Sequence, residues 1–113
     1  VHANGRMTLG ENIADHGGLQ VSYQAFKKAT AAAPLEVKDG FTPEQRFFLA
    51  YANVWANNTR PEAILQLTKI DVHSLGKWRV DAALPHIAAW YEAFGITEKD
   101  PMYVPVAERV SIW

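Results

Sequence analysis

The chain has 113 residues, of which 49% are hydrophobic and 20% are charged, so we expect one folded domain rather than a disordered segment. Eleven basic and twelve acidic residues give a formal net charge of −1, and no basic cluster is longer than the Lys27-Lys28 pair, which argues against a nucleic-acid partner. No apolar run reaches the roughly 18 residues needed to cross a bilayer, and the absence of cysteine excludes disulfides and thiolate zinc sites.

The first predicted element is a helix over residues 9–33. Apolar residues recur along it at spacings that suit one helical face, and its alanine-rich end has a high helix propensity. Gly17 and Gly18 each cost roughly 1 kcal/mol in a helix relative to alanine. We therefore expect either a bend at the two glycines or the close approach of another backbone.

A second helix is predicted after a loop over residues 34–42. Thr42 suits the N-cap position, Pro43 suits the first turn, and Gln45 can complete a capping box with Thr42. The stretch that follows, FFLAYANVW, is apolar on most faces. It is therefore predicted to be the central buried helix.

Two more helices are predicted in the second half of the chain. Pro61 begins a helix that runs towards Ile70, and residues 71–79 form a loop. A further helix covers residues 80–94 and stops at Gly95. A tail follows whose last residue, Trp113, is expected to pack against the rest. Because no convincing pair of strands is present, the predicted fold class is all-α.

Glu11 and Asp15 lie four residues apart, so they share one helical face and can point at the same place. One interpretation is a capping box, TLGE, in which Thr8 caps the helix and Asp15 is a solvated acid. The other is that Glu11 binds zinc and Asp15 orients a ligating histidine, because catalytic zinc commonly takes two His and one Glu. The chain cannot complete such a site alone, since H-E-x-x-H spacing is absent among its histidines, His2, His16, His73 and His86.

Several sequence blocks, in this order, resemble the C-terminal part of the neprilysin-like zinc metalloendopeptidases: NGRMTLGENIADHGGLQVSYQAF, PEQRFFLAYANVWANNTRPE, DVHSLGKWRV and an ending on Trp. The resemblance implies that residues 1–113 are a compact helical segment of a gluzincin-type, thermolysin-like catalytic domain. In this family the H-E-x-x-H helix lies upstream. His16 stands where the family often has Asn, and the absence of a cysteine near the C-terminus suggests a bacterial member.

The resemblance assigns roles to the two carboxylates and thereby favours the metal interpretation. Glu11 is expected to be the third protein ligand of the zinc, with both histidine ligands supplied by the upstream helix. Asp15 is expected to hold one of those histidines through its second ring nitrogen.

The DVHSLGKWR block carries the residues expected to act on the substrate. His73 matches the family's transition-state histidine, which in its protonated form stabilises the negative charge that develops on the carbonyl oxygen, and Asp71 is expected to orient it. Arg79 matches the substrate-binding arginine, whose planar fork can hold a carbonyl. Gly76 is expected to let the loop turn between them.

Val54 and Trp55 match family positions that wall the pocket for the residue after the scissile bond, a pocket that favours bulky apolar side chains. Core packing is the alternative interpretation for both, and one aromatic ring can serve both purposes.

The expected function is zinc-dependent endopeptidase activity, the hydrolysis of oligopeptides or small proteins, in a parent enzyme exported by a bacterium to the periplasm, cell envelope or exterior. Its expected partners are a peptide substrate and the upstream part of the same domain. The 113-residue piece alone is expected to be inactive, and its uncovered surfaces could form a dimer. The alternative is a non-catalytic helical module that binds peptides in the cleft around Trp55 and Arg79.

Overall fold

The structure, a computed structural model, describes residues 2–112. Its elements are, in chain order, α1 (Gly5–Thr30), α2 (Pro43–Val54), α3 (Pro61–Ile70), α4 (Gly76–Asp81), a 3₁₀ turn (Leu84–His86), α5 (Ala88–Phe94) and a second 3₁₀ turn (Val106–Glu108). The described residues contain no strand, only an isolated bridge between Lys38 and Phe41. The all-α prediction is therefore confirmed, while the prediction for Trp113 lies outside the described residues.

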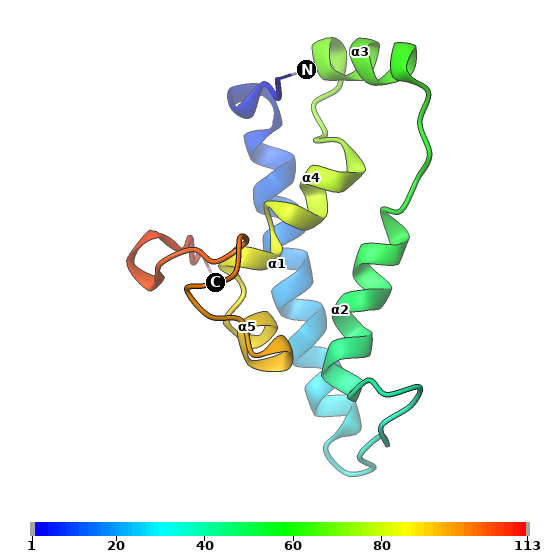
Figure 1. Cartoon of the computed structure of the whole chain (residues 1–113), viewed down its shortest axis with the longest axis vertical. Helices are drawn as coiled ribbons and strands as arrows, with labels where there is room; N and C mark the ends of the chain where they lie inside the picture. The colour runs from blue at the N-terminus through cyan, green and yellow to red at the C-terminus, as the bar shows by residue number, and fades with distance from the viewer. Residues whose placement is uncertain (1, 113) are drawn as a thin grey trace.

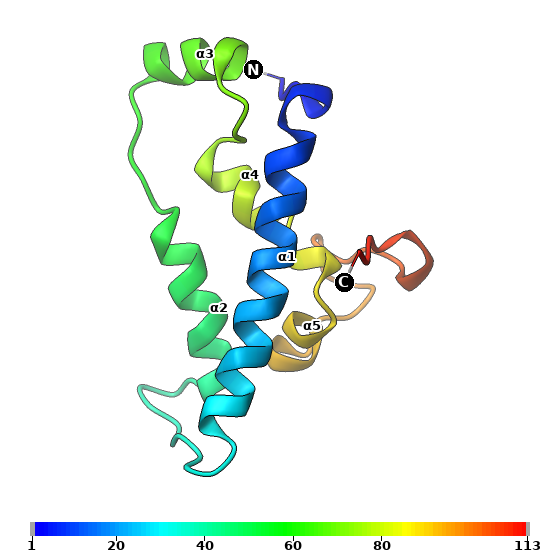
Figure 2. The same cartoon turned by 180° about the vertical axis from the view of Figure 1, so that it is seen from behind.

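The helices form an elongated molecule of 46 × 32 × 27 Å. Figures 1 and 2 show α1 and α2 running side by side in opposite directions along the long axis, with α3 lying across the end where α1 begins. The radius of gyration is 15.4 Å, against about 13 Å for a typical domain of this length. Among residues 2–112, no helix combines the length and apolarity that a membrane span requires.

Helix α1 begins earlier than the TLGE motif predicts. Asn4 is the N-cap, its Oδ1 accepting from the backbone N–H of Met7 at 3.1 Å. Thr8 lies inside the helix and donates to the Asn4 carbonyl at 3.1 Å, so the capping-box interpretation of TLGE is wrong. Glu11 and Asp15 are consequently interior helical residues.

The two glycines do not interrupt α1, which continues through them to Thr30. A β-carbon placed on Gly18 would meet nothing within 4 Å. The close backbone approach expected at the glycine pair is therefore absent at Gly18.

The hydrophobic core lies where α1, α2 and α5 meet, and its centre is Phe48, which is 1% exposed. The ring of Tyr23 stacks on Phe48 with the two centroids 5.3 Å apart. The other buried core residues are Leu19, Leu84, Ile87, Trp90 and Tyr91.

Helix α2 begins as predicted but is not a central buried helix. Thr42 and Gln45 exchange both hydrogen bonds of the capping box. Phe48 is its buried residue, whereas Leu49 is 40% and Val54 70% exposed. An apolar sequence does not by itself bury a helix, because burial also requires neighbours on every face.

The predicted helix over residues 80–94 is wrong in its bounds. Helix α4 already begins at Gly76 and ends at Asp81, and α5 begins only at Ala88. Pro85 cannot donate a backbone hydrogen bond and occupies the 3₁₀ turn between them. The break lets Leu84 and Ile87 both enter the core, and Gly95, with φ of 61°, ends α5 as expected.

Candidate active site

The five ionisable residues predicted to act come from two distant parts of the chain. Glu11 and Asp15 lie on α1, Asp71 and His73 on the segment between α3 and α4, and Arg79 on α4. The two pairs that are in direct contact, Glu11 with His73 and Asp15 with Arg79, are 62 and 64 residues apart in the sequence.

The imidazole of His73 lies between two carboxylates. Its Nε2 is 3.2 Å from Oε2 of Glu11, and its Nδ1 is 2.8 Å from Oδ1 of Asp71. The backbone N–H of His73 donates to the same Asp71 oxygen at 2.9 Å, and this bond, followed by that of the ring, lowers the pKa of Asp71. Asp71 therefore remains ionised beside the ring.

The side chains of Glu11 and His73 remain accessible to further partners. They are 43% and 44% exposed, respectively. A carboxylate with this exposure keeps lone pairs for another hydrogen-bond donor or for a cation.

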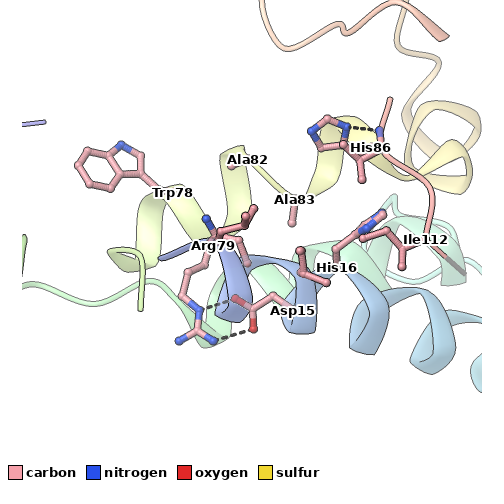
Figure 3. Close-up of a pocket in the computed structure, with 12 residues that line it drawn as sticks. Asp15, His16, Trp78, Arg79, Ala82, Ala83, His86 and Ile112 are labelled. Carbon is pink, nitrogen blue, oxygen red and sulfur yellow. Dashed lines mark hydrogen bonds and ion pairs between the residues drawn. The ribbon is translucent and has the colours of Figure 1, made fainter. Parts of the chain in front are cut away.

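Asp15 and Arg79 form a two-pronged ion pair across α1 and α4. Arg79 Nε donates to Asp15 Oδ2 and its terminal nitrogen donates to Oδ1, both at 2.6 Å. The side chains are only 15% and 14% exposed, and Figure 3 shows the guanidinium reaching from α4 to the carboxylate on α1. The hydrogen bonds to Asp15 raise the pKa of Arg79, so it stays charged.

Helix α2 and the residue after it also hold Arg79. Its guanidinium carbon lies 3.8 Å from the centroid of the Trp55 ring, a cation–π arrangement. The hydroxyl of Tyr51 donates to the Arg79 carbonyl at 3.0 Å. Burial, together with the nearby charge of Asp15, raises the pKa of Tyr51 and keeps that hydroxyl protonated. Sequence reasoning missed Tyr51, because nothing in its local pattern distinguishes it from a core aromatic.

Gly76 serves close packing rather than a turn, which corrects the role predicted for it. It is the first residue of α4, and its φ is not in the left-handed region. A β-carbon at this position would lie 2.6 Å from the Trp55 carbonyl oxygen and 3.0 Å from Nδ2 of Asn57. Glycine therefore allows α4 to begin directly against the end of α2.

A cavity of about 240 Å³ opens beside these residues, and Trp55, Asp71, His73 and Arg79 all line it. Trp55 thus forms part of a cavity wall. Val54 does not line this cavity, and its side chain points largely into solvent.

Arg79 also borders a second cavity of about 260 Å³ between α1, α4 and the C-terminal tail. Its walls are mostly apolar and include Trp78, Ala83 and Ile112 (Figure 3). His16 and His86 face each other there with ring centroids 6.1 Å apart.

Two further residues that sequence reasoning missed connect α1 to the segment that carries His73. Ser74 Oγ donates to Asn12 Oδ1 at 2.7 Å. Each follows directly after a predicted site residue in the sequence, but no sequence pattern links two positions so far apart.

The described residues do not form a zinc site by themselves. Within residues 2–112, no group of three or more His, Cys, Asp or Glu side chains is arranged to hold a metal ion. The half-exposed carboxylate of Glu11 is chemically suited to be one ligand, but catalytic zinc takes three from the protein. The remaining ligands would have to come from elsewhere.

Comparison with known proteins identifies the family of the chain. The sequence model of peptidase family M13 matches residues 1–110. The chain belongs to peptidase family M13. Human membrane metallo-endopeptidase-like 1 is 40% identical over 99% of this M13 chain, and human neprilysin is 36% identical over the same share. Human endothelin-converting enzyme 1 is 38% identical over 97% of the chain.

A solved structure of the same fold comes from the zinc metalloprotease Zmp1 of Mycobacterium tuberculosis in its open state. It matches 99% of this M13 chain with a TM-score of 0.94 and 34% sequence identity. The chain spans 14% to 15% of the length of the three human relatives and 17% of Zmp1. The similarity therefore concerns one segment of considerably longer proteins.

Proposed function

We propose that this M13 chain is the C-terminal part of the catalytic domain of a zinc-dependent endopeptidase. The observation that carries the proposal is that two distant segments meet, Glu11 contacting His73 and Asp15 contacting Arg79, and that His73 and Arg79 line one cavity. Family membership supplies the reaction class, and the arrangement of charges suits peptide hydrolysis.

Glu11 would be the one zinc ligand that this chain contributes, with two histidines from the upstream part of the same domain. In zinc peptidases the metal activates water and polarises the peptide carbonyl. Asp15 already accepts two hydrogen bonds from Arg79, and its remaining lone pairs would hold one of the upstream histidines.

His73 and Arg79 would bind the substrate on this chain's side of the cleft. The ring of His73, held by Asp71, would donate a hydrogen bond to the carbonyl oxygen as its negative charge develops. Arg79 uses two N–H groups on Asp15, and the others would hold a second substrate carbonyl. Trp55, which lines the cavity, would wall the pocket for a bulky apolar residue after the scissile bond, whereas the exposed Val54 is no part of that wall in this chain.

The substrates would be oligopeptides or small proteins, and we place the parent enzyme outside the cytoplasm of a bacterium. The bacterial Zmp1 relative and the lack of cysteine support a bacterial source. Cell fractionation with an antibody against this segment tests the location, and signal confined to the cytoplasm would contradict it.

The decisive experiment measures zinc content and peptide cleavage in the full-length protein. We expect Glu11→Ala to lose both, because removing one of three protein ligands weakens metal binding strongly. Glu36→Ala, which removes an exposed carboxylate from the loop after α1, should change neither. Retention of zinc and rate by Glu11→Ala would overturn the ligand assignment.

The isolated 113-residue chain provides a second test. It should neither bind zinc tightly nor cleave peptides, because its described residues lack a complete ligand set. Cleavage by the isolated chain that survives Glu11→Ala would contradict the proposal.

A further inference from the structure

Two contacts between α1 and the segment before α4 lie next to each other. Glu11 meets His73 at 3.2 Å, and the following residue on each segment makes the second contact, Ser74 Oγ donating to Asn12 Oδ1 at 2.7 Å. The side-chain hydrogen bond therefore joins the two segments immediately beside the proposed zinc ligand and the proposed transition-state histidine.

The Asn12 side chain is itself held in one orientation from α1. Its Nδ2 donates to Thr8 Oγ1 at 3.4 Å, and that hydroxyl donates to the Asn4 carbonyl at 3.1 Å. Thr8 is 5% exposed. With its amide nitrogen turned towards Thr8, Asn12 presents its oxygen to Ser74, so the acceptor is oriented by a contact within α1.

The other side-chain contacts of residues 71–75 do not fix this segment to α1 independently of the proposed reacting groups. Both hydrogen bonds of Asp71 go to His73, two residues away, so they order the segment internally without fixing it to α1. The Glu11–His73 contact joins half-exposed groups that the proposed reaction itself would use. Within residues 2–112, the Asn12–Ser74 bond is the side-chain hydrogen bond that ties residues 71–75 to α1 without involving a proposed reacting group.

We propose that Asn12 and Ser74 are positioning residues that set the location of the His73 ring relative to the Glu11 carboxylate. The inference rests on the proposed function, because Asn12 and Ser74 would act only through Glu11 and His73. Neither residue is assigned a contact with substrate or metal. Placing a reacting group matters because a displacement of about 1 Å can lower a catalytic rate roughly 100-fold.

The test uses the full-length protein with Ser74→Ala, Asn12→Ala and the double variant. We expect each single change to lower kcat roughly 10- to 100-fold while KM stays within about twofold and zinc content is unchanged. The double variant should be no slower than the slower single variant, because both remove the same bond. Ser74→Thr, which keeps the hydroxyl, should recover most of the rate, and Ser22→Ala, an exposed serine on α1, should match wild type.

A second readout does not depend on activity. Amide hydrogen exchange of residues 71–75 should become faster in Ser74→Ala and Asn12→Ala but not in Ser22→Ala, because the segment loses its tie to α1. If the wild-type protein cleaved no peptide, the proposed function would fail, and the exchange measurement would still decide whether the tie exists.

Three results would overturn the inference. Unchanged exchange at residues 71–75 in both single variants would show that the bond does not hold the segment. Rate losses that multiply in the double variant would show that Asn12 and Ser74 act independently. A rise in KM with unchanged kcat in Ser74→Ala would make Ser74 a substrate contact instead.

Discussion

The two ends of this molecule are stabilised by different physics. Where α1, α2 and α5 meet, aromatic and aliphatic side chains exclude water around Phe48. Around Arg79, the contacts are ion pairs, hydrogen bonds and one cation–π stack, and large apolar side chains such as Leu9 and Val72 remain exposed nearby. The residues that give the chain its stability are thus largely separate from those proposed to act, and substitutions can test this separation.

The largest expected effect is at the packed end. Phe48→Ala should lower the free energy of unfolding of the chain by about 3–5 kcal/mol, because it leaves a cavity at the centre of the core. Val54→Ala, on the same helix but 70% exposed, should change it by less than about 0.5 kcal/mol. Urea denaturation measures both, and equal effects would mean that the core is not where α1, α2 and α5 meet.

At the other end, Asp15→Asn should have a smaller effect on stability and a larger one on the cleft. Loss of the charge-assisted bonds to Arg79 should cost about 1.5–3 kcal/mol by the same measurement. Peptide cleavage by the full-length protein should fall as well, because Arg79 would lose its orientation. Asp81→Asn, an exposed acid on α4, is the control; identical results for the two variants would show that the ion pair contributes nothing.

A local cap at the packed end should matter less than either. Thr42→Ala removes the acceptor for the Gln45 backbone N–H and should destabilise the chain by about 1 kcal/mol. Its control is Ser22→Ala, an exposed hydroxyl on α1. A cap without effect would indicate that tertiary packing alone, including the bond from Gln45 to the Ala93 carbonyl, holds the start of α2.

The smallest effect should depend on pH and arise between the two ends, at His86. Its Nδ1 accepts from the Val110 backbone N–H at 3.0 Å, which requires that nitrogen to be unprotonated. Burial, followed by the charges of His16 and Arg109, lowers the pKa of His86 below its ordinary value of 6.5. The unfolded chain therefore binds this proton more readily, so stability is complete above pH 6.5 and declines as the pH falls towards the folded pKa.

The comparison of wild type with His86→Gln isolates this contribution from that of the carboxylates. The free energy of unfolding, measured between about pH 8 and pH 5, should fall more steeply for wild type than for the variant. Parallel curves would show that protonation of His86 is not coupled to folding.

Much of the local structure was predictable because its causes are local. The Thr42 capping box, Pro61 at the start of α3 and Gly95 after α5 each depend on groups within a few residues, and all three were found as expected. The errors have non-local causes. Helix α2 is half exposed because the described chain places no neighbour on its outer face, and the helix predicted over residues 80–94 is broken so that two of its residues can enter the core.

The candidate site divides in the same way. Short blocks of sequence were enough to indicate the family and to propose Glu11, Asp71, His73 and Arg79 as site residues, because a resemblance to a family depends on particular side chains in a particular order. They did not reveal that Asp15 pairs with Arg79, that Tyr51 and Trp55 hold that arginine, or that Asn12 meets Ser74.

The sequence by itself therefore determined the helical class, the ends of helices at Thr42, Pro61 and Gly95, and the identity of the candidate groups, since propensity, capping and side-chain chemistry act over a few residues. Only the tertiary structure decided which groups meet. The contacts of Asn12 with Ser74 and of Asp15 with Arg79 join residues 62 and 64 positions apart, so they depend on how α1, α2 and α4 pack. Gly76 lets the start of α4 lie against the end of α2, where a β-carbon would not fit. Such packing is a property of the whole chain, because each contact stabilises its site only after the helices that carry it have come together.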